Sequence, residues 1–551
     1  MKRNPAYLAA LALGGICAAL LLWLWVHDRA DAQRLRAARA DAPLALTPAP
    51  APAANPAPNP VTLSLLAALQ TLLTRNDTRA KEAVLSFKDE DAYRRFLARA
   101  QKSGLTLLGQ LDALRTAHVR YDAFSALQKD LLDNSADYDA VSANYVMTIP
   151  GPPAKDDRAP VDAVPFGNRA LQFLGVDPAA SARAAWGQGV TIAVLDTGIA
   201  RDATFGDARV RYLDIGLGTA AGTGSDDGHG TAVASLAAGA APDAPGVAPA
   251  ANLLSIRVTD STGASDLFTV AQAILAATDA GAKIINISLG GYATSATLDA
   301  AIAYARDQGA VIVAAAGNDQ AAQLAWPAAD SRVISVGAVD AAGQQVSFSN
   351  SGPQLSLTAP GYGVQTAWLD GGRVTVDGTS ISAPLVAGTI AAVLSQTPSL
   401  TPTQAWSVLQ QTASDAGPPG DDPDYGHGIL NLGWAMNRND PTRIDTAISS
   451  HYYDAANHEM DFVVQNRSAL DVTGLTLAID AAGTPSTQLI PPLAPGAIYV
   501  AKVPVDAAAL AAGASLRYTT QLINPSGVTD AVPANNRKSS VLSPPAPTPV
   551  K

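Results

Sequence analysis

The sequence predicts an α/β protein with a doubly wound parallel sheet, preceded by a small α/β unit and followed by a β-sandwich. Three observations support this fold class. Between residues 165 and 440, short apolar runs alternate with alanine-rich helical patterns, which is typical of parallel strands covered on both faces. Residues 61–150 show the order strand, helix, strand, strand, helix, strand, as in small α/β units. Residues 448–541 show strand-like runs divided by Gly, Pro and Asn, as in sandwiches.

The N-terminal region is predicted to enter a membrane. Residues 6–26 are an unbroken apolar stretch, close to the roughly 20 residues that a membrane-spanning helix needs. We therefore expect an anchor at residues 1–26, with a cleaved signal peptide as the alternative. Residues 27–60 are rich in Pro and Ala, which predicts an extended linker. The single cysteine, Cys17, excludes an intramolecular disulfide.

The charge excludes one class of partner. A net charge of −11 and a pI near 5.0 argue against nucleic-acid binding, which usually needs a basic patch. The Asp residues are scattered and lack the spacing of an EF-hand calcium loop. We therefore predict no cofactor from the sequence, and leave calcium binding open.

Small and polar residues follow three of the predicted strands in the central segment. The apolar runs 191–195, 284–287 and 311–314 end in Asp196, in Ser288-Leu289-Gly290 and in Ala315-Ala316-Gly317-Asn318, respectively. Ligands of open α/β sheets bind at the carboxyl ends of the strands. These residues are therefore candidates for a functional site.

Ser380 has the position expected of a nucleophile. It lies in Gly378-Thr379-Ser380, where an apolar helical pattern begins, and the first backbone N–H groups of a helix are free to hold an oxyanion. We place Pro384 in the same first turn, where proline is tolerated. A serine nucleophile needs a histidine base, and His229 opens another helical segment. That base in turn needs a carboxylate to fix its tautomer.

Four motifs together resemble the signatures of subtilisin-family serine proteases. They are Asp196-Thr197-Gly198, His229-Gly230-Thr231, Ala316-Gly317-Asn318 and Gly378-Thr379-Ser380, in that order along the chain. The resemblance implies a triad of Asp196, His229 and Ser380, with Asn318 as side-chain donor to the oxyanion. It also implies that Ser288, Leu289 and Gly290 pair with extended substrate, and that Ala315, Ala316 and Gly317 line the pocket for the residue before the cleaved bond. Ile381 departs from the family pattern, which usually has Met there.

Residues 80–148 resemble, more weakly, the propeptide of the same family. The similarity lies in residues 84–89 and in a terminal strand near residues 141–146. It implies a ferredoxin-like fold that inhibits the protease in a zymogen, with its tail in the active site. We expect the protein to cleave itself within residues 147–165. The C-terminal segment 448–541 resembles sandwiches appended to secreted enzymes, and residues 542–551 form a Pro-rich tail.

The sequence therefore predicts a serine endopeptidase that cleaves proteins or peptides through an acyl-enzyme intermediate. The expected partners are these substrates, the protein's own propeptide, and a membrane through the N-terminal helix, and the expected location is the bacterial cell envelope, outside the cytoplasm. Two alternatives are a catalytically inactive binding protein of the envelope and a sedolisin-like acid peptidase. The second uses Glu and Asp in place of His, and residues 166–440 contain no Glu.

Overall fold

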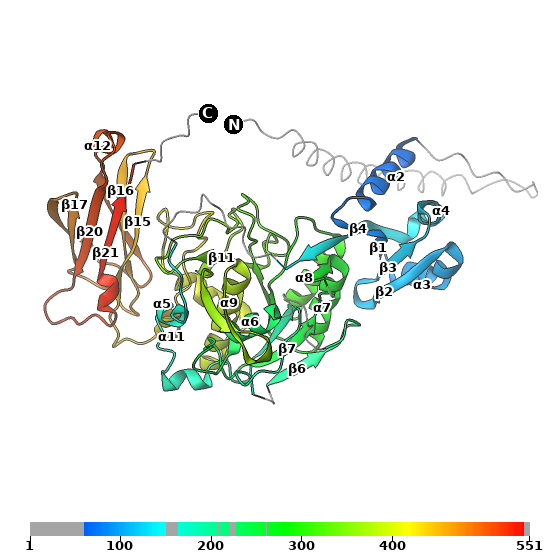
Figure 1. The fold of residues 1–551 in the computed structure, drawn as a ribbon, viewed down its shortest axis with the longest axis horizontal. Helices are drawn as coiled ribbons and strands as arrows, with labels where there is room; N and C mark the ends of the chain where they lie inside the picture. Colours follow the sequence, from blue (N-terminus) through cyan, green and yellow to red (C-terminus); the bar gives the residue numbers. More distant parts are fainter. Residues whose placement is uncertain (1–59, 150–162, 207–208, 220–227, 261, 545–551) are drawn as a thin grey trace, which may run out of the picture. The chain divides into compact units, whose positions relative to one another are not determined.

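The computed structural model describes residues 60–149, 163–206, 209–219, 228–260 and 262–544 (Figure 1). The predicted anchor, almost all of the linker and most of the tail lie outside these residues, as does most of the interval in which self-cleavage is expected. The contacts described below lie within the compact unit formed by residues 64–551.

A parallel sheet forms the centre of the described structure, and each neighbouring pair of its strands is parallel. Across the sheet, the strands are β12 (Leu357–Pro360), β11 (Ile334–Val339), β10 (Val311–Ala315), β9 (Ile284–Ile287), β5 (Thr191–Asp196), β7 (Asn252–Arg257) and β6 (Val210–Leu213). The three apolar runs that the sequence analysis names, 191–195, 284–287 and 311–314, lie in β5, β9 and β10. The predicted α/β fold class is confirmed.

Helices cover both faces of this sheet. Successive side chains of a strand point to opposite faces, so Ile192 and Val194 of β5 pack with α6 (His229–Ala238) and α9 (Thr379–Gln396). Ala193 and Leu195 pack with the other pair of helices, α7 (Leu267–Asp279) and α8 (Ala296–Asp307). Among the described residues, α9 is the one helix long and apolar enough to cross a membrane, and 89% of it is buried inside the protein. It is a core helix of this domain.

The N-terminal domain has the predicted ferredoxin-like topology. After α2 (Pro60–Leu73), its elements are β1 (Thr78–Phe87), α3 (Glu90–Arg99), β2 (Leu105–Leu111), β3 (Thr116–Tyr121), α4 (Phe124–Asp133) and β4 (Tyr138–Thr148). The sheet has the order β2-β3-β1-β4, with antiparallel neighbours. Phe87 stacks near Tyr93 and Phe96 of α3 in its core.

The sheet of the N-terminal domain continues into the central domain. Strand β8 (Ala264–Asp266), which directly precedes α7, pairs antiparallel with the end of β4. Val146 lies opposite Asp266, and Thr148 lies opposite Ala264. The last residues of β4 are therefore held at the surface of the central domain.

The C-terminal segment folds as the predicted β-sandwich. One sheet contains β15 (Thr446–Asp454), β16 (Glu459–Asn466) and β19 (Ile498–Pro504), and the other contains β18 (Thr484–Leu489), β17 (Thr476–Ala481), β20 (Leu516–Ile523) and β21 (Arg537–Leu542). Buried residues of both sheets, among them Phe462 and Tyr518, share one core. The short helix α12 (Ala507–Ala511) lies between β19 and β20 along the chain.

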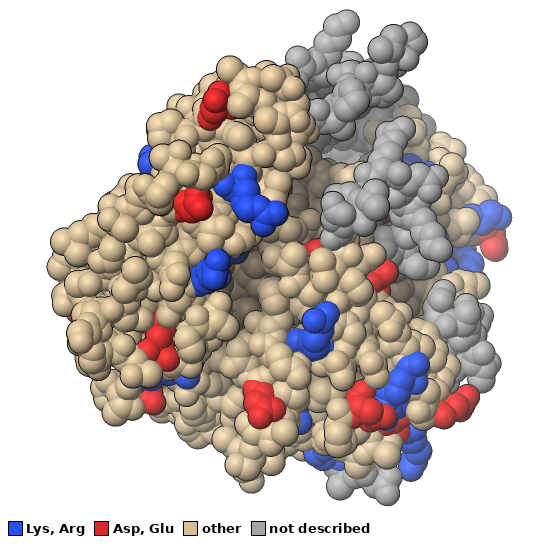
Figure 2. Space-filling model, turned by 60° about the vertical axis from the view of Figure 1, so that its left-hand side comes forward, with Lys and Arg blue, Asp and Glu red and all other residues tan. Residues whose placement is uncertain are grey.

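Shorter elements complete the central domain. They are α5 (Ala170–Phe173), the hairpin of β13 (Val364–Ala367) and β14 (Arg373–Val376), α10 (Pro402–Gln411) and α11 (Leu432–Asn437). On the face drawn in Figure 2, acidic and basic side chains are interspersed over the surface.

Candidate active site

The predicted site residues lie at the ends of neighbouring elements of the central domain. Asp196 is the last residue of β5, and His229 is the first residue of α6. Ser380 is the second residue of α9, which begins at Thr379 as the sequence predicts. Asn318 follows the carboxyl end of β10. The parallel sheet thus brings residues that are far apart in the sequence to one edge.

Asp196, His229 and Ser380 form a continuous polar relay. The Nδ1 atom of His229 lies 2.9 Å from Oδ1 and 3.0 Å from Oδ2 of Asp196. The Nε2 atom of His229 lies 3.1 Å from Oγ of Ser380. The carboxylate of Asp196 is fully buried, and it also accepts a hydrogen bond from the backbone N–H of Thr197. With Nδ1 protonated toward Asp196, Nε2 is the atom able to take the proton of Ser380.

Asn318 presents an unpaired donor beside Ser380. Its Oδ1 accepts hydrogen bonds from the backbone N–H of Thr379 at 2.9 Å and from the hydroxyl of Thr379 at 2.8 Å. This fixes the amide, and its Nδ2 is buried without a hydrogen-bond partner among the described residues. A Cβ atom at Gly378 would lie 2.9 Å from that Nδ2 and 3.1 Å from Oγ of Ser380. The two atoms therefore face the same small space, where an oxyanion would meet a preorganised donor.

Thr379 orients Asn318, a role that could not be predicted from the motifs in the sequence. Its hydroxyl also accepts a hydrogen bond from the backbone N–H of Gly317. Thr379 stands directly before the candidate nucleophile in the motif, and this position was the available signal. The placement of Pro384 was wrong, because it is the sixth residue of α9 and lies beyond the first turn.

The predicted substrate edge is occupied by the chain itself. Gly290 and Thr148, the last residue of β4, exchange two backbone hydrogen bonds of 3.0 Å in an antiparallel bridge. Ser288 and Leu289 directly precede Gly290 and are fully buried. This edge can therefore bind an extended segment by strand addition.

The predicted wall of the pocket, at residues 315–317, is built from small residues. Ala315 and Ala316 are buried, and Gly317 has a φ of 110°, a conformation that favours glycine. A Cβ at Gly317 would lie 2.2 Å from Nδ2 of Asn350. The close approach of Asn350 therefore requires glycine at this position.

Tyr292 connects the substrate edge at residues 288–290 with the segment that follows the wall at residues 315–317. Its hydroxyl donates to the carboxylate of Asp319 and accepts a hydrogen bond of 2.8 Å from Asn350. Burial, followed by the bond to Asp319, raises the pKa of Tyr292 to about 12. Tyr292 follows the substrate edge and Asp319 follows Asn318, so this contact was not evident from either motif alone.

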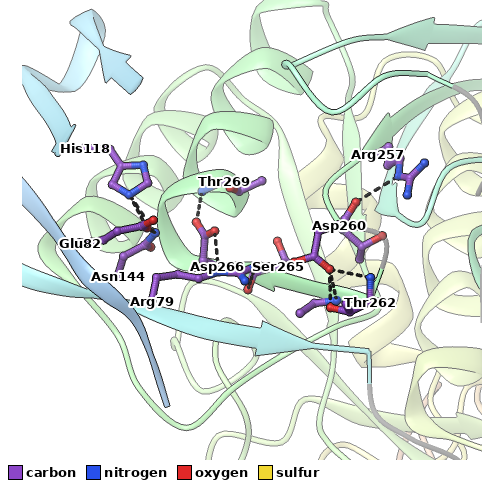
Figure 3. Close-up of polar contacts among 12 residues, drawn as sticks. Arg79, Glu82, His118, Asn144, Arg257, Asp260, Thr262, Ser265, Asp266 and Thr269 are labelled. Atoms are coloured by element: carbon purple, nitrogen blue, oxygen red, sulfur yellow. Dashed lines mark hydrogen bonds and ion pairs between the residues drawn. The ribbon is translucent and has the colours of Figure 1, made fainter. Parts of the chain in front are cut away.

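Two groups of polar contacts hold the N-terminal domain on the central domain (Figure 3). In the first, Arg79 of β1 contacts Asp260 at 3.0 Å and Asp266 of β8 at 3.4 Å. The side chain of Asp266 also caps α7, because it accepts a hydrogen bond of 2.9 Å from the N–H of Thr269. Arg79 of the N-terminal domain therefore pairs with two carboxylates of the central domain.

The second group is buried. Glu82 contacts Nε2 of His118 at 2.8 Å and accepts a hydrogen bond of 3.2 Å from Asn144. Burial by itself raises the pKa of Glu82, but His118, Asn144 and Arg120 together lower it to about 2. The amide oxygen of Asn144 accepts a hydrogen bond of 3.2 Å from the N–H of Phe268. Asn144 thus satisfies one of the free donors in the first turn of α7.

The ring of Phe268 fills a space in the N-terminal domain. It is 3% exposed and lies 4.8 Å from the ring of His118. A Cβ at Gly109 of β2 would lie 2.7 Å from this ring, so the absence of a side chain there leaves room for it. Phe268 of the central domain therefore makes an apolar contact with the N-terminal domain.

No group of three or more His, Cys, Asp or Glu residues within the described ranges could hold a metal ion. The side chain of His427 contacts Asp421 and Gln410, and neither residue belongs to the relay. We assign it no part in the site.

Comparisons with known proteins match the central domain. A family model described as the subtilase family matches residues 187–428. A thermostable alkaline protease of Halalkalibacterium halodurans is 37% identical over 274 residues, which are 49% of this chain and 73% of the relative. Subtilisin Savinase of Lederbergia lenta is 35% identical over 271 residues, which are 49% of this chain and 97% of the relative. A solved structure of a mutant protease domain of PatA is 30% identical and covers 46% of this chain and 96% of its own, with a TM-score of 0.43.

Proposed function

The chain belongs to the subtilase family and is a subtilisin-like serine endopeptidase, and from that premise we propose how its residues cleave a peptide bond and how its N-terminal domain controls them. Oγ of Ser380 attacks the carbonyl carbon of the substrate while Nε2 of His229 takes the hydroxyl proton. The 3.1 Å distance between these atoms supports this step. Asp196 orients the imidazole and stabilises its cationic form.

The negative charge that develops on the substrate oxygen is held by two donors. One is the Nδ2 of Asn318 and the other is the backbone N–H of Ser380 in the first turn of α9. The unpaired, buried state of Nδ2 is the observation that supports this role. When the tetrahedral intermediate collapses, the imidazolium donates its proton to the leaving amine and an acyl-enzyme remains. Water then attacks the acyl carbon while His229 takes a proton from it, and the imidazolium returns that proton to Oγ of Ser380 as the bond between Oγ and the acyl carbon breaks and the acid leaves.

Substrates are proteins or peptides that present an extended segment. Their backbone adds to the edge at Ser288-Leu289-Gly290, as β4 does through Thr148. Ala315, Ala316 and Gly317 form a wall of the pocket for the side chain before the cleaved bond. We assign no cofactor to these steps.

The N-terminal domain acts as the enzyme's own inhibitor, and the protein is made as a zymogen. The pairing of Thr148 with Gly290 supports this proposal, since a substrate could not use the edge while β4 occupies it. Residues 147–165 then contain the bond that the enzyme cleaves in itself. In this account, residues 1–26 anchor the N-terminal domain in a membrane of the bacterial cell envelope, and cleavage separates the protease from the anchor.

The experiment that tests the proposal is intact mass spectrometry of the wild-type protein and of Ser380→Ala. The wild type is expected to yield a fragment that begins within residues 148–166, and Ser380→Ala is expected to stay full-length. Ser382→Ala is the matched control, because Ser382 is also buried in α9 but donates to the carbonyls of Ala359 and Pro360. Cleavage of Ser380→Ala at the same site in the purified protein would contradict self-processing.

A further inference from the structure

Helix α9 lacks one of its backbone hydrogen bonds next to the nucleophile. Proline has no N–H, so Pro384 cannot donate to the carbonyl of Ser380, four residues earlier. This carbonyl is enclosed by protein, since Ser380 is 2% exposed. A buried carbonyl without a donor costs stability. A second donor is therefore needed at this point.

Ser288 supplies that donor. Its hydroxyl donates a hydrogen bond of 3.0 Å to the carbonyl oxygen of Ser380. Ser288 directly follows β9 and is fully buried. The bond therefore ties the backbone of the nucleophile to the strand end that continues into the substrate edge.

Asn286 fixes the direction of this hydroxyl. Its Nδ2 donates a hydrogen bond of 2.9 Å to Oγ of Ser288. The hydroxyl oxygen is then an acceptor toward Asn286, so its proton is directed to Ser380. Residues two apart on a strand share a face, and Ile284 of this face packs in the same core as α9. A polar side chain in the otherwise apolar strand 284–287 is explained by this role.

We infer that Ser288 and Asn286 are positioning residues for Ser380, and that they replace the helical hydrogen bond that Pro384 removes. They touch neither the substrate's reacting atoms nor the proton in transfer. They fix the carbonyl group of Ser380 and, through the Cα atom, the orientation of Oγ toward His229. This inference rests on the proposed role of Ser380 and adds a function to Ser288 beyond its backbone contact with substrate.

The test is a double-mutant cycle on the self-processed enzyme, with kcat and KM measured on a small peptide substrate. Ser288→Ala is expected to lower kcat by about tenfold, because misplacement by a fraction of an ångström weakens a reaction that depends on alignment. KM is expected to change little, since the backbone of residues 288–290 remains. In a Pro384→Ala background, an alanine N–H at position 384 can donate to the carbonyl of Ser380. There, Ser288→Ala is expected to lower kcat less than twofold relative to Pro384→Ala alone.

Asn286→Asp provides an independent variant of similar shape. Its carboxylate accepts from the hydroxyl of Ser288 and draws the proton away from Ser380, so kcat is expected to fall as in Ser288→Ala, without a further loss when the two are combined. The inference would be overturned if Ser288→Ala lowered kcat equally in the wild-type and the Pro384→Ala backgrounds. It would also be overturned if Ser288→Ala lowered kcat in neither background. A loss of melting temperature alone, with kcat unchanged, would reduce Ser288 to a structural role and also overturn it. If the wild type has no peptidase activity, the proposed function fails instead.

Discussion

Replacement of Asn144 by alanine is expected to loosen the N-terminal domain from the central domain. The amide oxygen of Asn144 accepts the N–H of Phe268 at 3.2 Å, and the side chain is fully buried. Without it, a donor in the first turn of α7 is left unpaired in a dry interface, which costs about 1–3 kcal/mol. Since about 1.4 kcal/mol corresponds to a factor of ten, the undocked population is expected to rise about 5- to 150-fold.

The assay is amide hydrogen exchange, measured on the full chain with Ser380→Ala, which is expected to stay full-length. Adding Asn144→Ala is expected to speed exchange of the Gly290 amide, which donates to Thr148 of β4 across the interface, by the same factor. The Thr269 amide is an internal control, because it donates to Asp266 within the central domain. Asn134→Ala is the matched control variant, since Asn134 bonds to Asp130 inside the N-terminal domain.

Two results would refute this reasoning. Unchanged exchange at Gly290 would mean that Asn144 does not contribute to docking. Equal acceleration at Gly290 and Thr269 would mean that the central domain itself has loosened, rather than the contact between the domains.

Burial, followed by the nearby carboxylates of Asp422 and Asp421, raises the pKa of Asp415 from 3.8 to about 6. The folded state therefore holds a proton more tightly than the unfolded state, and up to about 3 kcal/mol of stability is lost as pH rises from about 4 through 6. In thermal melts, Asp415→Asn should raise Tm at pH 8 but not at pH 3. A gain in Tm that is independent of pH would contradict this. Ile381 has no oxidisable sulfur, so activity should survive peroxide in the wild type and be lost faster in Ile381→Met; equal loss in both would count against it. Asn318→Ala should lower kcat by a factor of about 10²–10³, the range measured for the corresponding donor of subtilisin itself. Steady-state kinetics that show a rise in KM with kcat unchanged would argue against an oxyanion role.

The sequence allowed the relay to be predicted because its members stand where a predicted strand ends or a predicted helix begins. The run 191–195 ends in Asp196, and a helical pattern starts at Thr379, so both positions follow from local periodicity and the topology of a parallel sheet. The resemblance of the four motifs then assigned His229 and Asn318. These are local signals, and the structure places all four residues together.

Contacts between distant segments could not be predicted in the same way. Nothing in the strand 284–287 indicates that Asn286 directs the hydroxyl of Ser288, and nothing near residue 109 indicates that Phe268 fills the space above Gly109. The error about Pro384 has the same origin. Proline is disfavoured inside helices because a carbonyl loses its donor, and here a donor comes from Ser288, which directly follows β9.

The central claim is that His229 activates Ser380 as a nucleophile. The most direct measurement is covalent labelling of the processed enzyme by a small fluorophosphonate, followed by peptide mapping, in the wild type and in His229→Ala. If His229 activates Ser380, Ser380 is the single phosphonylated residue in the wild type, and the labelling rate in His229→Ala is at least about a hundredfold lower, on the order of the loss expected without a general base. An unlabelled Ser380 in the processed wild type, or equal labelling rates in the two proteins, would contradict it.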